Sequence, residues 1–268
     1  MRGAALIAGR GATADPVVGS VKSIAGFVMT ETTAPSAHTP AIDRPVFIIA
    51  TARSGTTLLQ RYLNLSPELV IWGEHAGFLN PLQQSLQRLT SDAALEKFQA
   101  YDEDTRARVR DGRPIVSDAK WTIEWLNPFT RESILGAYRA FLSDLFSQTL
   151  PPGVRWGFKE VQYGLAQVRM LAELFPEARF VCPLREPFDI IVSKVRAFTN
   201  KPSDNDQLEI YIKQNQRFLD LLAALDKRSE IRSMSLLLDE LQSQPESVLA
   251  RVAAFLDVAP LPNDKIAD

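Results

Sequence analysis

A short segment behind a continuous apolar run combines a cation, a glycine and three hydroxyl groups: Arg53-Ser54-Gly55-Thr56-Thr57. The apolar run 46–50 predicts a buried strand and 58–63 predicts a helix, so the segment is a strand-to-helix turn. Backbone amides at the start of a helix lack intrahelical partners and carry partial positive charge, so such a turn can bind phosphate. The alternative is a plain turn in which Ser54 or Thr56 caps the helix and Arg53 is a surface charge.

This segment differs from the loop that binds nucleoside triphosphates. That loop reads Gly, four residues, then Gly-Lys-Ser/Thr. When Gly55 is placed at the second glycine, Ala50 stands at the first and Thr56 stands where the lysine belongs. Without the lysine, the segment favours a donor that carries one phosphate and one sulfate over a triphosphate with Mg²⁺.

A second candidate anion site begins where another apolar run ends. Arg185 follows the run 180–184, and Ser193 stands eight residues later on a helix that starts near Pro187 or Phe188. The planar guanidinium of arginine matches a phosphate dianion well. An ordinary surface arginine and a helix serine are the alternative, because this spacing alone is weakly specific.

Taken together, the two motifs resemble those of the sulfotransferases that use 3′-phosphoadenosine 5′-phosphosulfate (PAPS). Locally the chain is most similar to the tyrosylprotein and carbohydrate branch of that family, and the resemblance runs from about Arg44 to Leu256. One departure is Ala52, where the family usually has proline. The resemblance implies PAPS as donor, adenosine 3′,5′-bisphosphate (PAP) as product, and eight donor-binding residues: Arg53, Ser54, Gly55, Thr56, Thr57, Leu58, Arg185 and Ser193.

Sulfuryl transfer, by analogy with phosphoryl transfer, needs a base for the acceptor and cations for the charge on the transferred group and leaving oxygen. Glu74, in Trp72-Gly73-Glu74-His75, follows a predicted strand, and the resemblance implies that it is the base. His75 is the alternative base, and a helix cap is the alternative role for Glu74. The resemblance also implies that Lys159 stabilises the leaving group and that Arg53 neutralises the 5′ side, so no metal is required.

Strands alternating with helices predict an α/β fold with three α/β/α layers and a central parallel sheet, like that of P-loop nucleotide hydrolases. Residues 1–43 predict a flexible arm and 44–268 the sulfotransferase domain, in which 75–150 is a mainly helical acceptor-site region. Trp121 and Trp125 share a helix face there, as acceptor-pocket or core residues. The predicted strands are 46–50, 69–72, 155–159, 179–184 and 231–238. The predicted helices outside 75–150 are 58–63, 167–175, 208–225, 245–256 and the helix that starts near Pro187 or Phe188.

Composition limits the partners and the compartment. The net charge is −2, which argues against a nucleic-acid partner, and one cysteine with two histidines excludes a disulfide framework and a structural zinc site. No apolar run is long enough for a membrane span, so a cytoplasmic location is expected. The expected acceptor is a small-molecule, lipid or saccharide hydroxyl or amine. Two alternatives remain: a non-catalytic nucleotide-binding relative, since residues 260–268 lack the family's closing glycine, and an ATP-dependent small-molecule kinase.

Overall fold

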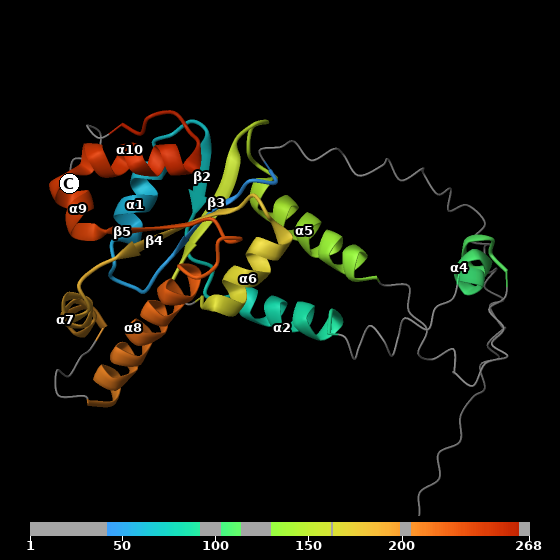
Figure 1. Ribbon diagram of the computed structural model, residues 1–268, viewed down its shortest axis with the longest axis horizontal. Helices are drawn as coiled ribbons and strands as arrows, with labels where there is room; N and C mark the ends of the chain where they lie inside the picture. Colours follow the sequence, from blue (N-terminus) through green and yellow to red (C-terminus); the bar gives the residue numbers. More distant parts are fainter. Residues whose placement is uncertain (1–41, 92–102, 114–129, 162, 199–204, 263–268) are drawn as a thin grey trace, which may run out of the picture. The chain divides into compact units, whose positions relative to one another are not determined.

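The four apolar residues of β1 (Val46–Ile49) form the middle strand of a five-stranded sheet and are fully buried. The computed structural model describes residues 42–91, 103–113, 130–161, 163–198 and 205–262. The strand order is β2-β3-β1-β4-β5, and each pairing is parallel (Figure 1). The other strands are β2 (Leu69–Trp72), β3 (Arg155–Glu160), β4 (Arg179–Leu184) and β5 (Ser233–Leu237). The predicted parallel sheet is therefore confirmed.

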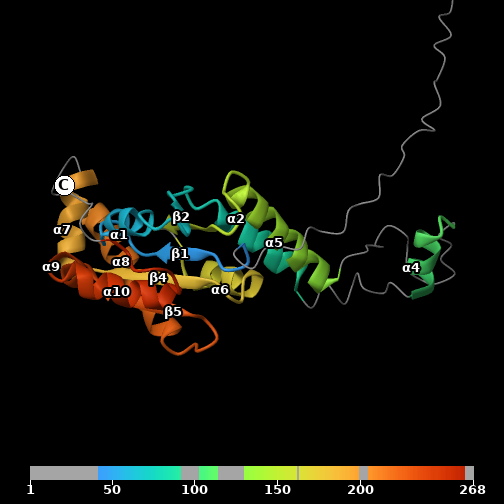
Figure 2. The ribbon, with the colours of Figure 1, turned by 90° about the horizontal axis from the view of Figure 1, so that it is seen from above.

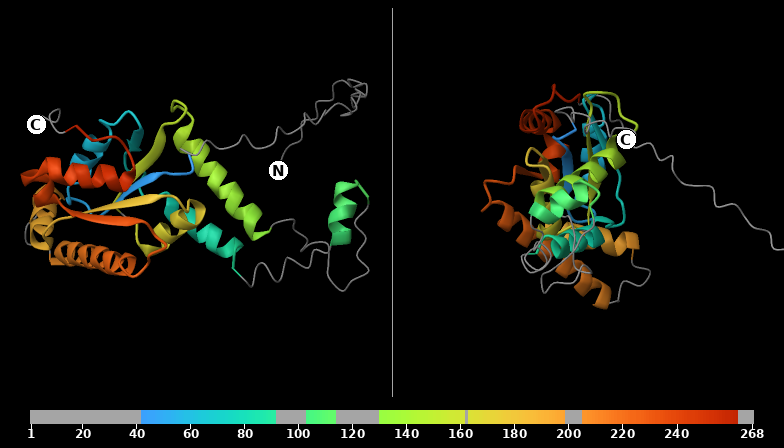
Figure 3. Two further views of the ribbon diagram at one scale, coloured as in Figure 1. Left: turned by 45° about the horizontal axis from the view of Figure 1, so that its top comes forward. Right: turned by 90° about the vertical axis from the view of Figure 1, so that its right-hand side faces the viewer.

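Helices cover both faces of the sheet, because most of its strand residues are apolar on both sides. One face packs against α1 (Thr56–Leu63), α9 (Leu238–Ser243) and α10 (Pro245–Leu256). The other packs against α2 (Leu79–Leu89), α5 (Arg131–Ser147), α6 (Leu165–Leu174) and α8 (Asn205–Leu225). Figure 3 (left) shows α10 and α8 on opposite sides of the strands, and Figure 2 shows α2 beside α5. The remaining described helices are α7 (Pro187–Phe198) and α4 (Glu103–Arg110).

The predicted elements lie close to those observed, with two instructive differences. The strand predicted over 231–238 spans Ser233–Leu237, and Leu238 begins the short helix α9, which the sequence did not predict. The helix predicted from residue 58 begins at Thr56. The pairing of β4 with β1 ends at Val181, whereas its pairing with β5 continues through Pro183 to Leu184.

Several expectations fall on residues outside the described part of the chain. These are nearly all of the arm 1–43, Trp121 and Trp125, and residues 263–268. Within 75–150, the described segments include three helices, α2, α4 and α5. No helix among the described residues is long and apolar enough to cross a membrane.

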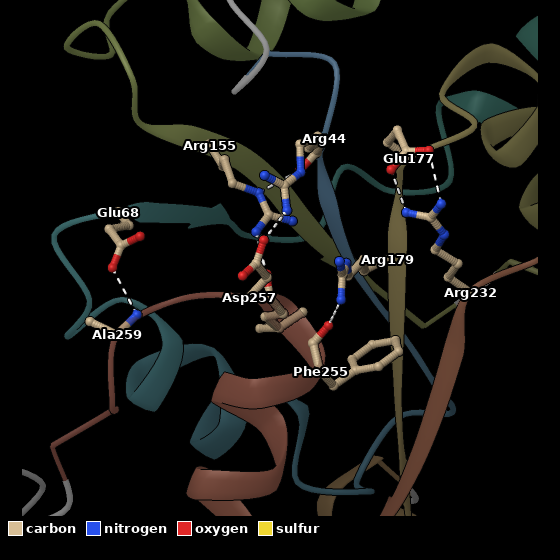
Figure 4. Close-up of polar contacts among 10 residues, drawn as sticks. Arg44, Glu68, Arg155, Glu177, Arg179, Arg232, Phe255, Asp257 and Ala259 are labelled. Carbon is tan, nitrogen blue, oxygen red and sulfur yellow. Dashed lines mark hydrogen bonds and ion pairs between the residues drawn. The ribbon is translucent and has the colours of Figure 1, made fainter.

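Arginines at the amino end of the sheet hold α10 in place (Figure 4). Arg155 donates from Nε to the carbonyl oxygen of Arg44 at 2.7 Å and from Nη1 to that of Leu256 at 2.5 Å. Arg179 donates to another carbonyl of the last turn of α10, and Arg44 pairs with Asp257 at 2.6 Å. Cations suit the negative end of a helix dipole, and their N–H groups satisfy its unpaired carbonyls. This edge of the sheet is built for stability.

Candidate active site

At the opposite, carboxyl edge, every strand leads into a residue of one candidate site. Arg53 follows β1, Glu74 follows β2 and Arg185 follows β4. A pocket of about 350 Å³ is lined by residues that include these three, together with Gly55, Thr56, Thr57 and Leu238. In parallel α/β sheets ligands bind at the carboxyl ends of the strands. We call this cavity the donor pocket, after the donor-binding residues that the sequence predicts among its lining.

The turn between β1 and α1 lines the donor pocket and has an unusual backbone conformation. Arg53 and Gly55 have φ values of 73° and 88°, and Gly55 is the N-cap of α1. The first intrahelical bond runs from the Leu59 amide to the Gly55 carbonyl at 3.1 Å, so the amides before it have no intrahelical partner. Ser54 donates its hydroxyl to the carbonyl of Thr51 at 2.7 Å. Neither serine nor threonine caps α1, which overturns the plain-turn alternative in that respect.

Glu74, which lines this pocket, forms an ion pair with Lys159. Lys159 Nζ lies 2.7 Å from Glu74 Oε1 and 3.3 Å from Thr57 Oγ1. Lys159 itself is mostly buried at the end of β3, whereas the Glu74 side chain is 41% exposed. Glu74 makes no helix cap, because Phe78 occupies the N-cap position of α2. The structure thus brings together a carboxylate, an ammonium and a loop hydroxyl.

The neighbouring Glu160 fixes the loop that carries Glu74, a function that the sequence did not reveal. It is fully buried, and its carboxylate accepts the amides of His75 at 3.3 Å, Gly77 at 3.1 Å and Val161 at 2.8 Å. Successive side chains of a strand point to opposite faces, so Lys159 and Glu160 hold this loop from two sides. The sequence shows only that an acidic residue stands at the end of this strand. Which backbone amides it accepts is decided by the fold.

His75 packs away from the donor pocket, in an aromatic cluster. Its ring centroid lies 4.9 Å from that of Phe146, 5.5 Å from Phe158 and 5.8 Å from Phe78. Burial lowers the pKa of His75, an effect that the nearby Glu160 partly offsets. His75 Nδ1 is buried, and none of the described residues forms a hydrogen bond with it.

The two predicted anion motifs meet through Arg53. Its Nε donates to the hydroxyl of Ser193 in α7 at 2.9 Å, which joins the β1–α1 turn to the second motif. Arg185 lines the donor pocket, and its Nη2 lies 3.7 Å from Oδ2 of Asp189. Its Nε is buried and has no hydrogen-bond partner in the part of the chain that the structure describes. A buried guanidinium N–H without an acceptor fits a site for an anionic ligand. Leu58, by contrast, packs against the core beneath the loop.

A family comparison decides what kind of protein carries this pocket. The sulfotransferase family matches residues 45–262, which include each of the described site residues. The chain belongs to the sulfotransferase family. A comparison with curated proteins gives no match. Among the described residues of this sulfotransferase, no group of three or more His, Cys, Asp and Glu side chains is placed to hold a metal ion.

Solved structures of other sulfotransferases resemble this one. The sulfotransferase domain of the Synechococcus PCC 7002 olefin synthase is 22% identical, with 84% of this chain and 78% of that chain covered and a TM-score of 0.49. Sulfotransferase STF9 from Mycobacterium avium is 16% identical, with 81% of this chain and 64% of that chain covered and a TM-score of 0.47. Mouse sulfotransferase SULT7A1, complexed with PAP, is 10% identical, with 83% of this chain and 60% of that chain covered and a TM-score of 0.43.

Proposed function

We propose that this sulfotransferase uses PAPS as its donor and moves the sulfuryl group to a hydroxyl or amine of a small-molecule, lipid or saccharide acceptor. The observation that carries the proposal is the contact of Lys159 Nζ with both Glu74 and Thr57, two residues that line the donor pocket. A base candidate and a cation candidate therefore lie together beside the turn that would bind phosphate. The single cysteine, Cys182, is buried and unpaired, which supports a cytoplasmic location.

The donor pocket offers suitable groups for the two ends of PAPS. The amides at the start of α1 and the Arg53 guanidinium would hold the 5′-phosphosulfate. Arg185, whose Nε has no hydrogen-bond partner among the described residues, and Ser193, which accepts from Arg53, would hold the 3′-phosphate. Because Arg53 donates to Ser193 in this structure, donor binding would exchange that contact for bonds to the nucleotide.

The proposed reaction is an in-line displacement at sulfur. The acceptor oxygen forms a bond to sulfur while the bond between sulfur and the bridging phosphate oxygen breaks. Glu74 takes the acceptor proton, and Lys159 donates a hydrogen bond to the leaving oxygen. The packing of His75 between aromatic rings supports Glu74 over His75 as the base.

Calorimetric titration with PAP, ATP and 5′-AMP tests the donor. We expect micromolar binding of PAP that depends on the 3′-phosphate and weakens by about 1.5–3 kcal/mol in Arg185→Ala, the range for a lost charged hydrogen bond. Arg251→Ala is the matched control, since Arg251 is exposed on α10. Stronger binding of ATP than of PAP would favour a kinase and contradict the proposal, as would the absence of PAP binding.

A further inference from the structure

A second, larger pocket adjoins the donor pocket. It has a volume of about 690 Å³, and Ala52 and Val161 line both cavities. Its other lining residues come from the ends of β1 and β3 and from α7 and α8; they include Thr51, Tyr163, Lys194, Tyr211, Arg217 and Phe218. A cavity of this volume suits one small molecule. We call it the Lys194 pocket.

Lys194 carries a buried positive charge in this pocket. The residue is only 1% exposed, and its Nζ donates to Thr51 Oγ1 at 2.9 Å and to Gln214 Oε1 at 2.9 Å. Lys194 Nζ also lies 5.5 Å from the centroid of the Tyr211 ring. An ammonium has three protons to donate, and these contacts use two of them. In the part of the chain that the structure describes, Lys194 has no carboxylate partner within ion-pair distance.

Buried ammonium groups without a counter-charge are rare, because the charge loses its hydration. The exposed Arg217 adds a second positive charge to the pocket, and none of its described lining residues is acidic. An anionic group on a ligand would replace the neutral acceptor Gln214 with a charge-assisted bond. Tyr163, Tyr211 and Phe218 would surround an apolar or aromatic part of the same ligand.

We propose that the Lys194 pocket binds the acceptor, and that this acceptor is a small molecule with a hydroxyl or amine to be sulfated, an apolar body and an anionic group held by Lys194. The inference rests on the proposed function, because it assigns the donor to the neighbouring pocket. Sulfuryl transfer then proceeds as described above, with the acceptor proton taken by Glu74 and PAP as the leaving nucleotide. Ala52 and Val161, shared by the two pockets, mark where acceptor and donor would meet.

The experiment compares hydroxylated aromatic and aliphatic carboxylic acids with their methyl esters, as a panel of matched pairs. Binding is measured by calorimetry with PAP at saturation, and transfer is measured with ³⁵S-labelled PAPS. We expect acids as a class to bind about tenfold or more tightly than their esters, the size of a lost charged hydrogen bond. In Lys194→Met this preference should fall to less than about threefold, while the affinity for PAP stays within about twofold.

Two further variants test whether the preference for acids depends on positive charge inside the pocket. Lys213→Met is the matched control, because Lys213 is an exposed lysine of α8 paired with Glu209, and it should keep the full preference for acids. Arg217→Met alters an exposed residue at low risk to folding and should reduce the preference in part.

Each remaining outcome decides against the inference in an identifiable way. Equal binding of acids and esters to the wild type, or an unchanged preference in both Lys194→Met and Arg217→Met, overturns it while leaving the donor assignment intact. Loss of PAP binding in Lys194→Met overturns it by assigning the pocket to the donor. If the wild type itself does not bind PAP, the proposed function has failed first.

Discussion

At the scale of single residues, the candidate site separates two acidic side chains by their surroundings. Glu160 is fully buried and accepts hydrogen bonds from three backbone amides, so its carboxylate stabilises the loop after β2. Glu74 is partly exposed and has one ionic partner, Lys159. Only the second carboxylate is accessible to an acceptor, which supports its proposed role as base.

The charge of Lys194 gives a pH dependence to acceptor binding. Burial lowers the pKa of Lys194 to about 8. The ammonium is therefore present below pH 8 and is lost as the pH rises through that value. We expect the KM for acidic acceptors to increase by about tenfold between pH 7 and pH 9.5, since the charged hydrogen bond disappears. Initial rates of sulfuryl transfer at fixed saturating PAPS measure this.

Other groups that face Lys194 are not expected to produce the same profile. Arg217 of α8 also lines the pocket, and burial raises the pKa of Tyr163, the residue that faces the pocket after β3. Tyr211 of α8, whose ring faces Lys194, is kept in all variants. Ester acceptors and the variant Lys194→Met are the controls, and neither should show the increase. A rise of equal size with the esters would assign the titration to the chemical step instead.

At the scale of elements, the β1–α1 turn depends on Gly55. Its φ of 88° is a conformation that other residues adopt at a cost of about 1–2 kcal/mol. A Cβ at this position would also lie 2.4 Å from Cδ1 of Leu238, the first residue of α9. Gly55→Ala should therefore displace the amides at the start of α1 and weaken PAP binding by about tenfold or more. Calorimetry with PAP checks this.

Gly136 in α5 provides the opposite control. Apart from its two chain neighbours and the backbone of its own helix, no described residue has an atom within 4 Å of a Cβ placed there, and the residue is exposed in the interior of a helix. Gly136→Ala should raise the free energy of unfolding by about 0.5–1 kcal/mol and leave PAP binding unchanged. Wild-type PAP affinity in Gly55→Ala would show that the turn does not hold the donor.

The elements themselves were largely predictable from sequence, because continuous apolar runs and turn residues mark buried parallel strands. The prediction missed α9, since Leu238 extends the apolar run of β5 and nothing local marks the change. The pairing of Glu74 with Lys159 depends on β2 and β3 being neighbours, although 85 residues separate them. Lys194 was also missed, because its burial depends on packing against α8.

At the scale of the whole sheet, the arginine contacts that hold α10 and the proposed active site occupy opposite edges. The arginines of Figure 4 lie at the amino ends of the strands, and the donor pocket lies at the carboxyl ends. Arg155→Met should remove donors from the carbonyls of Arg44 and Leu256 and lower the free energy of unfolding by about 2–4 kcal/mol. Urea denaturation measures the loss.

Catalysis by the folded fraction should be unaffected in Arg155→Met. Transfer rates at 25 °C, corrected for the folded fraction, are expected to stay within about twofold of the wild type, since the variant changes no residue of the donor pocket. Arg251→Ala, on the same helix α10, should change the free energy of unfolding by less than about 0.5 kcal/mol. A large loss of turnover in folded Arg155→Met would mean that the two edges are coupled.

The central claim is that Glu74 takes the acceptor proton while Lys159 supports the leaving group. The most direct test is ³⁵S-sulfuryl transfer from PAPS to the matched acceptor panel by wild type and Glu74→Gln. Glutamine keeps an oxygen for Lys159 but is no base, so transfer should fall by about 10²–10⁴-fold while PAP affinity stays nearly constant. Transfer by Glu74→Gln at the wild-type rate would contradict the account, most plainly if His75→Gln had lost it.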